Sequence, residues 1–411
     1  MVRSTLERFR SSQAPMRHPP MHVSFLDPEF QANPFAAYRW LRQHAPVYWD
    51  AEAPAWSDEK GVWGVTSYDH IRTVSLDQLT YTSTQGSRID APPVPSMINR
   101  DEPEHQLRRG IIRKRFTPQS VRALEPFVRE AARTLISSAG AEFDFVEAIA
   151  KPLPMMVIGQ LLGVPEADYG KLLDWSDLIA TGMSNRTASF EIEVREAVDQ
   201  FDDYISEWYR RRLAEPGNDL LSALVVARQS GLLMEHKDFL HEALLLLVGG
   251  DETTRHVASG GLDALLTNPD SMLRLRRDLG LLDSTIEEML RWVCPVKNIK
   301  RTATRDVTLG DCVVRTGDKL LLLYESGNRD ESVFVNPDLF DIERSPNHHL
   351  SFGGFGRHYC LGANLARLEL SLLFEELLKA TTVIDRGSEL PRTRWGTFVL
   401  GLESLPIRVT S

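Results

Sequence analysis

A lone cysteine behind a glycine-rich loop is the clearest candidate for chemistry in this 411-residue chain. Residues 352–362 read FGGFGRHYCLG, and Cys360 stands at the start of a predicted helix. Glycine permits positive φ angles and close backbone approach, so such a loop can lie flat against a ligand. The positive end of a helix dipole favours a thiolate, which is the form that ligates a metal or attacks an electrophile.

Three interpretations of this loop compete. A buried free cysteine beside a structural turn is the first, since free cysteines are among the most buried residues. A dinucleotide-binding loop is the second, but Tyr359 stands where the third glycine belongs and no parallel βαβ pattern surrounds it. The third is a loop whose thiolate ligates a haem.

The loop resembles the haem-binding signature of the cytochrome P450 family, Phe-Gly-x-Gly-x-His/Arg-x-Cys-x-Gly. The matching positions are Gly354, Gly356, His358, Cys360 and Gly362. Phe352 lies eight residues before the cysteine instead of the usual seven, a shift found in members that oxidise sterol side chains. The resemblance implies haem b as the cofactor, with Cys360 as its metal ligand.

A second candidate site lies in the predicted helix over residues 238–267, which contains Gly249-Gly250-Asp251-Glu252-Thr253-Thr254. Each glycine costs roughly 1 kcal/mol in a helix interior, which favours a local groove or bulge. An acid beside two threonines offers a proton relay. Glycines that serve helix packing, with a solvated Glu252, are the alternative.

This segment resembles the oxygen-binding motif of the same family. The resemblance implies that Glu252 and Thr253 deliver protons to dioxygen, that Asp251 takes the variable position, and that Gly250 lies beside the cofactor.

Two further groups of residues match the family in order and spacing. Glu288 and Arg291 are three apart on a helix that Ser284 is predicted to open, with Glu287 completing a capping box. Most such pairs are surface features worth under ~1 kcal/mol. The resemblance implies instead that a downstream arginine, Arg344, joins them in a structural trio that holds the cysteine loop.

His105 and Arg109 would share one face of a helix that starts after Pro103. A basic surface helix is the plain interpretation. The resemblance implies that they bind the haem propionates together with Arg301 and His358.

The elements that must position these residues are mostly helical. Apolar residues recur at helical spacing from residue 104 to 279 and again from 361 to 378, whereas 62–66, 307–309, 312–315 and 319–324 read as strands. We expect a mainly α fold, and the resemblance implies a triangular helical prism with a minor β region. Residues 1–20 read as a loose tail and residues 21–411 as a single domain.

Composition narrows the class of protein. The net charge of −10 argues against a nucleic-acid binder, and three cysteines fit a reducing compartment, so a cytoplasmic location is expected. No apolar run approaches the ~20 residues of a membrane span. No flavin or NAD(P)H site is visible, so the resemblance implies electrons from a ferredoxin and its reductase.

Several stretches resemble actinobacterial members that oxidise the terminal methyl of a cholesterol or cholest-4-en-3-one side chain. Hydroxylation of another lipophile, such as a terpene, macrolide or branched fatty acid, and a non-catalytic haem sensor or carrier are the alternatives. An apolar substrate pocket is expected, although half of its candidates could be plain core residues. Its expected wall comprises Met97, Ile98, Leu245, Val248, Val293, Val296, Ile299, Phe398, Val399 and Leu400.

The segment over residues 108–115 carries five basic residues in eight. With Arg109 turned toward a propionate, Arg108, Arg113, Lys114 and Arg115 would remain at the surface. A local basic patch on an acidic protein would attract an acidic ferredoxin; a solvated helix face is the plain alternative.

Overall fold

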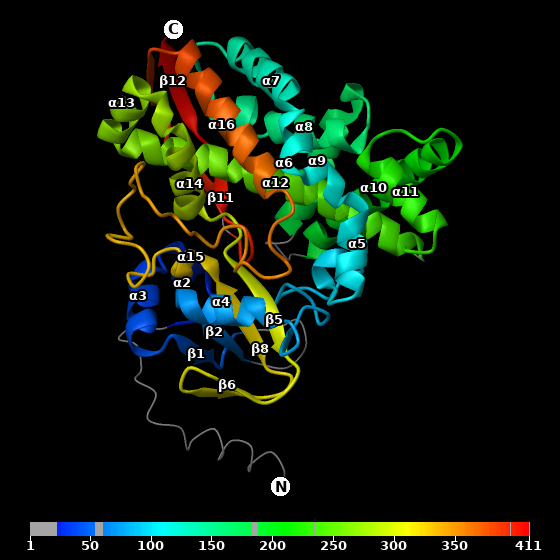
Figure 1. Ribbon diagram of the computed structural model, residues 1–411. Helices are drawn as coiled ribbons and strands as arrows, with labels where there is room; N and C mark the ends of the chain where they lie inside the picture. Colours follow the sequence, from blue (N-terminus) through cyan, green and yellow to red (C-terminus); the bar gives the residue numbers. More distant parts are fainter. Residues whose placement is uncertain (1–22, 54–60, 183–187, 234, 395, 411) are drawn as a thin grey trace.

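A long helix through the middle of the molecule organises the fold (Figure 1). The computed structural model describes residues 23–53, 61–182, 188–233, 235–394 and 396–410. The predicted tail over residues 1–20 lies outside them. Figure 1 shows most of the helices gathered in one part and the larger sheet, with α2, α3, α4 and α15, at the other, N-terminal end, which confirms a mainly α fold with a minor β region.

The helices are α2 (Pro28–Ala32), α3 (Phe35–His44), α4 (Tyr68–Leu76), α5 (Glu104–Ile112), α6 (Pro118–Arg122), α7 (Glu125–Ser138), α8 (Pro152–Leu162), α9 (Tyr169–Gly182), α10 (Ala188–Ala214), α11 (Leu220–Gln229), α12 (His236–Thr267), α13 (Pro269–Arg277), α14 (Leu282–Val293), α15 (Tyr324–Gly327) and α16 (Ala363–Ala380). Short helical turns are η1 (Met97–Asn99), η2 (Arg113–Phe116), η3 (Val146–Ala150), η4 (Glu166–Asp168) and η5 (Leu279–Leu281).

The strands are β1 (Val47–Asp50), β2 (Val62–Val65), β3 (Tyr81–Thr82), β4 (Glu142–Asp144), β5 (Asn298–Ala303), β6 (Val307–Leu309), β7 (Cys312–Val314), β8 (Lys319–Leu323), β9 (Val383–Arg386), β10 (Arg392–Arg394), β11 (Gly401–Ser404) and β12 (Pro406–Thr410). The largest sheet has the order β1-β2-β8-β5-β3, in which only the β2–β8 pair is parallel. Among the described residues, no helix is long and apolar enough to cross a membrane.

Helix α12 is buried over most of its 32 residues because α8, α9, α14 and α16 pack around it. A helix in such a position needs apolar residues on most of its faces, and Phe239–Leu247 and Val257–Leu265 supply most of them. Its first turn is closed by a capping box between Glu235 and Asp238. The predicted helix over 238–267 is therefore confirmed, and it begins two residues earlier.

Three local expectations were wrong. Helix α14 begins at Leu282, so Ser284 does not open it; the Ser284 hydroxyl instead donates to the carbonyls of Leu281 and Ile342. Glu287 accepts from Arg367, not from the helix start. Strand β4 falls inside the region expected to be helical, because Phe143 pairs with Ile407 near the C-terminal end.

The Glu288 carboxylate is a buried hub between α14 and the chain that leads to the cysteine loop. Arg291 donates two hydrogen bonds of 2.7 Å to it, and Arg344 donates one of 3.0 Å. The Asp341 N–H and the Asn347 amide also donate to it. Because Glu288 and Arg291 have no solvent exposure, this is a desolvated charge cluster and not surface decoration.

The other N–H groups of the two arginines donate hydrogen bonds to backbone carbonyls. Arg291 binds those of Asn328, Pro337 and Leu339, and Arg344 binds that of Val335. A long segment without strands or helices thereby receives fixed points along its length. It leads directly into the cysteine loop; that the hub thereby positions the loop stays a prediction.

We predict that Glu288→Ala lowers the free energy of unfolding by about 3–5 kcal/mol, because two guanidinium groups lose their buried counter-charge. Urea denaturation of the purified protein measures this. Glu207→Ala is the matched control, since Glu207 pairs with Arg210 and Arg211 on the exposed face of α10 and its loss should barely move the midpoint. Equal effects of the two substitutions would contradict the structural role of the hub.

Candidate functional site

The cysteine loop is shaped by its contact with helix α4. A Cβ atom on Gly354 would overlap the Ser75 side chain, and one on Gly356 would overlap the Ser75 backbone. Gly353 has a φ of 97°, in the left-handed region that glycine tolerates. The Cys360 N–H donates to the Phe352 carbonyl at 2.8 Å and closes the loop. The glycines therefore let the loop lie on α4, which fixes where Cys360 points.

Cys360 stands before the helix, not in its first turn, because α16 begins at Ala363 with Gly362 as its N-cap. Its side chain is solvent-accessible. The surrounding protein nevertheless desolvates the thiol and raises its pKa, although the Gly362 N–H and the charge of Arg109 oppose this. The expected thiolate thus does not arise from the helix end alone; a bound metal would supply the missing positive charge and deprotonate the thiol.

Four basic side chains meet beside the cysteine loop without a matching set of acids. The rings of His105 and His358 lie 4.2 Å apart between centroids. Arg301 is buried and donates to the Lys300 carbonyl at 2.9 Å, and Arg109 is half-buried. Within the described ranges, neither Arg109 nor Arg301 forms an ion pair, whereas His105 lies 3.4 Å from Glu102.

The electrostatics of this group call for an anion. Burial lowers the pKa of both arginines and of His105. Burial, followed by the charges of Arg301, His105 and Arg109, lowers the pKa of His358 to about 2. Buried cations need a counter-charge. A thiol next to buried arginines is the donor set that an iron porphyrin with two propionates requires, so the residues fit the implied haem.

One stripe of helix α12 is accessible in an otherwise buried helix. Leu245 and Val248 are partly exposed and Gly249 is exposed; Thr253 follows one turn later on the same face. The Thr253 hydroxyl donates to the Gly249 carbonyl at 3.2 Å. The helix is unbroken here, so the predicted groove amounts to this local hydrogen bond and the missing Gly249 side chain.

The two glycines of the pair have different neighbours. A Cβ atom on Gly250 would lie 2.9 Å from Ile158 of α8, whereas one on Gly249 would meet nothing within 4 Å. Packing between helices, which the sequence left as the alternative, therefore accounts for Gly250. Gly249 is the glycine that opens space on the accessible stripe.

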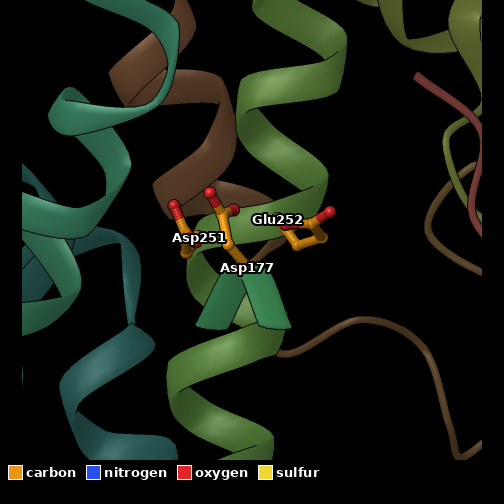
Figure 2. Close-up of side chains that lie close together, drawn as sticks. All are labelled: Asp177, Asp251 and Glu252. Atoms are coloured by element: carbon orange, nitrogen blue, oxygen red, sulfur yellow. The ribbon is translucent and has the colours of Figure 1, made fainter. Parts of the chain in front are cut away.

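Glu252 lies in a buried charge cluster with Asp251 and Asp177 of α9 (Figure 2). Oxygen atoms of these three carboxyl groups lie within 4.8 Å of one another. Arg255 forms ion pairs with Asp177 and Glu252, and His256 Nε2 lies 3.2 Å from Glu252. Glu252 is thus 2% exposed and paired, so the alternative of a solvated Glu252 is wrong.

Asp251 is the member of this cluster whose pKa is shifted toward neutral pH. Burial raises its pKa to about 7, with the charge of Arg255 opposing and that of Glu252 adding to the rise. The Ser176 hydroxyl donates to it at 2.8 Å. Lys151 lies 2.9 Å from Asp177 and pairs with Glu147 as well, so the cluster is rich in carboxyl groups relative to its cations.

The expected pocket residues fall into two clusters. Met97, Leu245 and Val248 belong to the helical core. Val296 pairs with Val399 in an isolated β-bridge, and Ile299 and Phe398 belong to the core of the larger sheet. Val293 contacts Gly260 of α12. Two surface pockets, of about 630 and 450 Å³, are lined mostly by other residues, so a shared substrate pocket remains a prediction.

The expectation for Arg108 was wrong. It is 4% exposed and lies 3.0 Å from Asp238 and 3.2 Å from Glu242, both on α12. Arg113 and Lys114 are exposed, as expected, and Arg115 donates to Asn218. The spacing of residues 108–115 could not reveal this, because the acids that turn Arg108 inward lie about 130 positions away.

Sequence reasoning also missed Arg255 and His256, which bind Glu252, and Arg367, which binds Glu287. The first two stand three and four residues after Glu252 on the same helix, so helical spacing could have found them. Arg367 had no local signal, since its partner lies 80 residues earlier.

Comparisons with known proteins agree with this site. The family model described as Cytochrome P450 matches residues 155–410. A steroid C26-monooxygenase of Mycolicibacterium smegmatis is 40% identical over 91% of this chain and 92% of its own. A methyl-branched lipid omega-hydroxylase of Mycobacterium bovis is 34% identical over 95% of this chain and 96% of its own. The Mycobacterium marinum cytochrome P450 in complex with pseudoionone superposes with a TM-score of 0.89, at 31% identity over 95% of this chain and 99% of that one.

Proposed function

Since this chain belongs to the cytochrome P450 family, we propose that it oxidises the terminal methyl group of a sterol side chain, with cholesterol or cholest-4-en-3-one as the substrate. It is a haem b monooxygenase with a cysteine ligand that uses dioxygen, a lipophilic substrate and electrons from redox partners. The observation that carries the proposal is the likeness to the steroid C26-monooxygenase along nearly the whole length of both chains. The displaced Phe352 in the cysteine loop supports it.

We propose Cys360 as the thiolate ligand and His105, Arg109, Arg301 and His358 as the partners of the propionates. One buried arginine, Arg301, and the half-buried Arg109 form no ion pair within the described ranges, which supports the second assignment, because an anion must balance them. The bound haem supplies activation of oxygen and its insertion into a C–H bond. The chain supplies the cations that orient the cofactor and the protein surface that shields the thiolate.

We also propose that Glu252 and Thr253 move protons on the accessible stripe of α12. Thr253 is the hydroxyl on this stripe, and Glu252 precedes it directly in the chain. Asp251, with a pKa of about 7, can exchange a proton beside Glu252 near neutral pH. Arg255 and His256 bind and orient the Glu252 carboxyl group.

A ferredoxin with its reductase is the proposed electron source, and the cytoplasm the proposed location. Arg113 and Lys114 are exposed directly after α5, the helix whose Arg109 faces the cysteine. A basic patch here would attract an acidic ferredoxin to the cysteine side of the haem. The three cysteines are free, in keeping with a reducing compartment.

A second candidate substrate is another lipophile with a methyl branch. The methyl-branched lipid omega-hydroxylase favours it, since that relative covers an even larger share of this chain at lower identity. Both candidates have a terminal methyl group on an apolar chain. A sensor or carrier is disfavoured because it needs no proton relay, whereas Glu252 and Thr253 stand together here.

We predict that cholest-4-en-3-one shifts the haem of the purified protein to the high-spin state in an optical titration. A ferredoxin with its reductase should then support formation of the side-chain alcohol, with rates that fall as salt rises. A branched fatty acid is the comparison ligand. If the fatty acid shifts the spin state and the sterol does not, the second candidate replaces the sterol as the proposed substrate. If peroxide supports turnover and no ferredoxin tested does, the proposed electron source is wrong.

The ligand assignment has its own test. The reduced CO complex of the wild type should show the red-shifted Soret band of a thiolate-bound haem, and Cys360→His should lose it. Cys312→Ala is the control, since its thiol is half-buried between β7 and the Val47 carbonyl and should leave the band unchanged. Survival of the band in Cys360→His would mean that another residue ligates the iron.

The proton relay predicts a loss of coupling. Thr253→Ala should keep substrate binding but release reducing equivalents as peroxide, because the hydroxyl that passes the proton is gone. Glu252→Gln should slow turnover by at least an order of magnitude, in line with about 10²–10⁴-fold for acid–base groups. Thr254→Ala is the control, as Thr254 is buried away from the accessible stripe. If Thr253→Ala and the wild type give equal product per electron consumed, the proposed role of Thr253 in proton delivery is wrong.

A further inference from the structure

A buried ion cluster joins helices α5 and α12 at the turn η1. Arg108 lies at its centre and is 4% exposed. Its guanidinium group is 2.7 Å from Glu104 on its own helix, 3.0 Å from Asp238 and 3.2 Å from Glu242 on α12. Neither the haem site nor the proton relay uses these residues.

The same cluster holds the loop that carries Met97. Arg108 donates to the Pro95 carbonyl at 2.8 Å. The Met97 backbone N–H lies close enough to the Glu242 carboxyl group to lower its pKa. Asn99 closes the loop on itself, because its side-chain N–H donates to the Val94 carbonyl and its side-chain Oδ1 accepts from the Ser87 N–H. The loop that carries Met97 is therefore braced internally by Asn99 and joined to α12 through Arg108.

Helical spacing places Glu242, the α12 member of this ion cluster, in line with the accessible stripe of α12. Residues 242, 245, 249 and 253 are separated by three, four and four positions, so they lie along one face. Glu242 is one turn before Leu245 and two turns before Gly249. The ion cluster that keeps Met97 close to Glu242 therefore places Met97 at one end of the accessible stripe, where the substrate side chain is proposed to lie.

The attraction between Arg108 and Glu242 keeps the loop that carries Met97 against α12. Burial raises the pKa of Glu242 to about 7, although the hydrogen bond and charge of Arg108 oppose the rise. Other charged groups around it are Asp238 on α12, Glu104 on α5, and Arg100, which follows η1 and is 3.9 Å from Asp238. Removing Arg108 would leave Glu242 buried without its cation, which is strongly unfavourable. Neutralising Glu242 would remove the contact between Arg108 and this part of α12, while Arg108 would keep Asp238 and Glu104.

A pocket of about 450 Å³ lies on the outer side of the cluster, lined by Pro95, Arg100, Glu104, Arg108 and Asp238 among others. It gives the loop room to move outward once the ion cluster is broken. The Pro95 end of the loop thus borders a pocket, and the ion cluster is what joins this end to α12.

We propose that Arg108 and Glu242 are positioning residues that hold Met97 against α12 and thereby set the width of the substrate site. This rests on the proposed function, which places Met97 in the wall of that site. The pair acts through Met97 and touches neither cofactor nor substrate. A wide, rigid sterol would need this wall in place, whereas a small haem ligand would not.

The test uses the haem-loaded protein and two readouts. Glu242→Gln keeps the shape of the side chain and removes its charge; Arg108→Met removes the cation. Glu376→Gln is the matched control, because Glu376 is also buried and bound by two arginines, Arg129 and Arg133, but on the α7–α16 side. Hydrogen exchange of the peptide containing residues 94–99 and optical titrations with cholest-4-en-3-one and imidazole are measured.

We expect Glu242→Gln to speed exchange of the 94–99 peptide about tenfold and to weaken sterol binding about tenfold, with imidazole binding unchanged within about twofold. Glu376→Gln should change none of these. Met97→Ala should weaken sterol binding by itself, and adding Glu242→Gln to it should cause little further loss, because the pair acts through Met97. Arg108→Met should follow Glu242→Gln.

Three results would overturn the proposal: unchanged exchange of the 94–99 peptide in Glu242→Gln, equal weakening of sterol and imidazole binding, or fully additive losses with Met97→Ala. Should Arg108→Met fail to fold, the isosteric Glu242→Gln decides alone. If the wild type does not bind the sterol, the proposed substrate is wrong, and the exchange measurement still decides whether the pair holds the Met97 loop.

Discussion

Helix α12 has to carry charged side chains through the middle of a low-dielectric core, and the rest of the structure supplies their partners. Asp238, Glu242, Asp251, Glu252 and Arg255 are all buried on this helix. An unpaired buried charge is too costly to persist. Arg108 of α5 pairs with Asp238 and Glu242. Asp177 of α9 pairs with Arg255, and the Ser176 hydroxyl donates to Asp251. These pairings fix how α5 and α9 lie against α12, and so where the accessible stripe is placed.

The cysteine loop is held in the same way, by close packing on one side and by hydrogen bonds on the other. On one side Gly354 and Gly356 let it contact α4 with no side chain between. On the other, Asn328 donates to the Arg291 carbonyl and to Ser351, and Ser351 donates to the Leu290 carbonyl, which ties the start of the loop to α14. Glu288 orders the chain that leads there. These contacts position the thiol close to the cations Arg109 and Arg301.

Interactions within one turn of helix or one short loop were predictable, and those between distant elements were not. The pairing of Glu288 with Arg291 followed from their spacing, as did the shared position of Gly249 and Thr253 on one helix face. Arg108 and Arg113 looked equivalent in a run of basic residues, yet one is buried and the other exposed. Ser284 and Glu287 had the spacing of a capping box, but carbonyl groups and Arg367 from elsewhere compete for them.

The sequence by itself determined the chemistry: one cysteine in a glycine loop, an acid before a threonine in a glycine-interrupted helix, and an apolar pattern that makes the fold mainly helical. These properties depend on residue type and on spacing over a few positions, which the chain carries directly. Only the tertiary structure decided the charge state and exposure of the groups. The pKa values of Cys360 and Asp251 are raised and Glu242 is buried against Arg108, because the desolvating groups and the counter-charges come from elements far away in the chain. Burial is a property of the packed molecule, so spacing along the chain could not have supplied it.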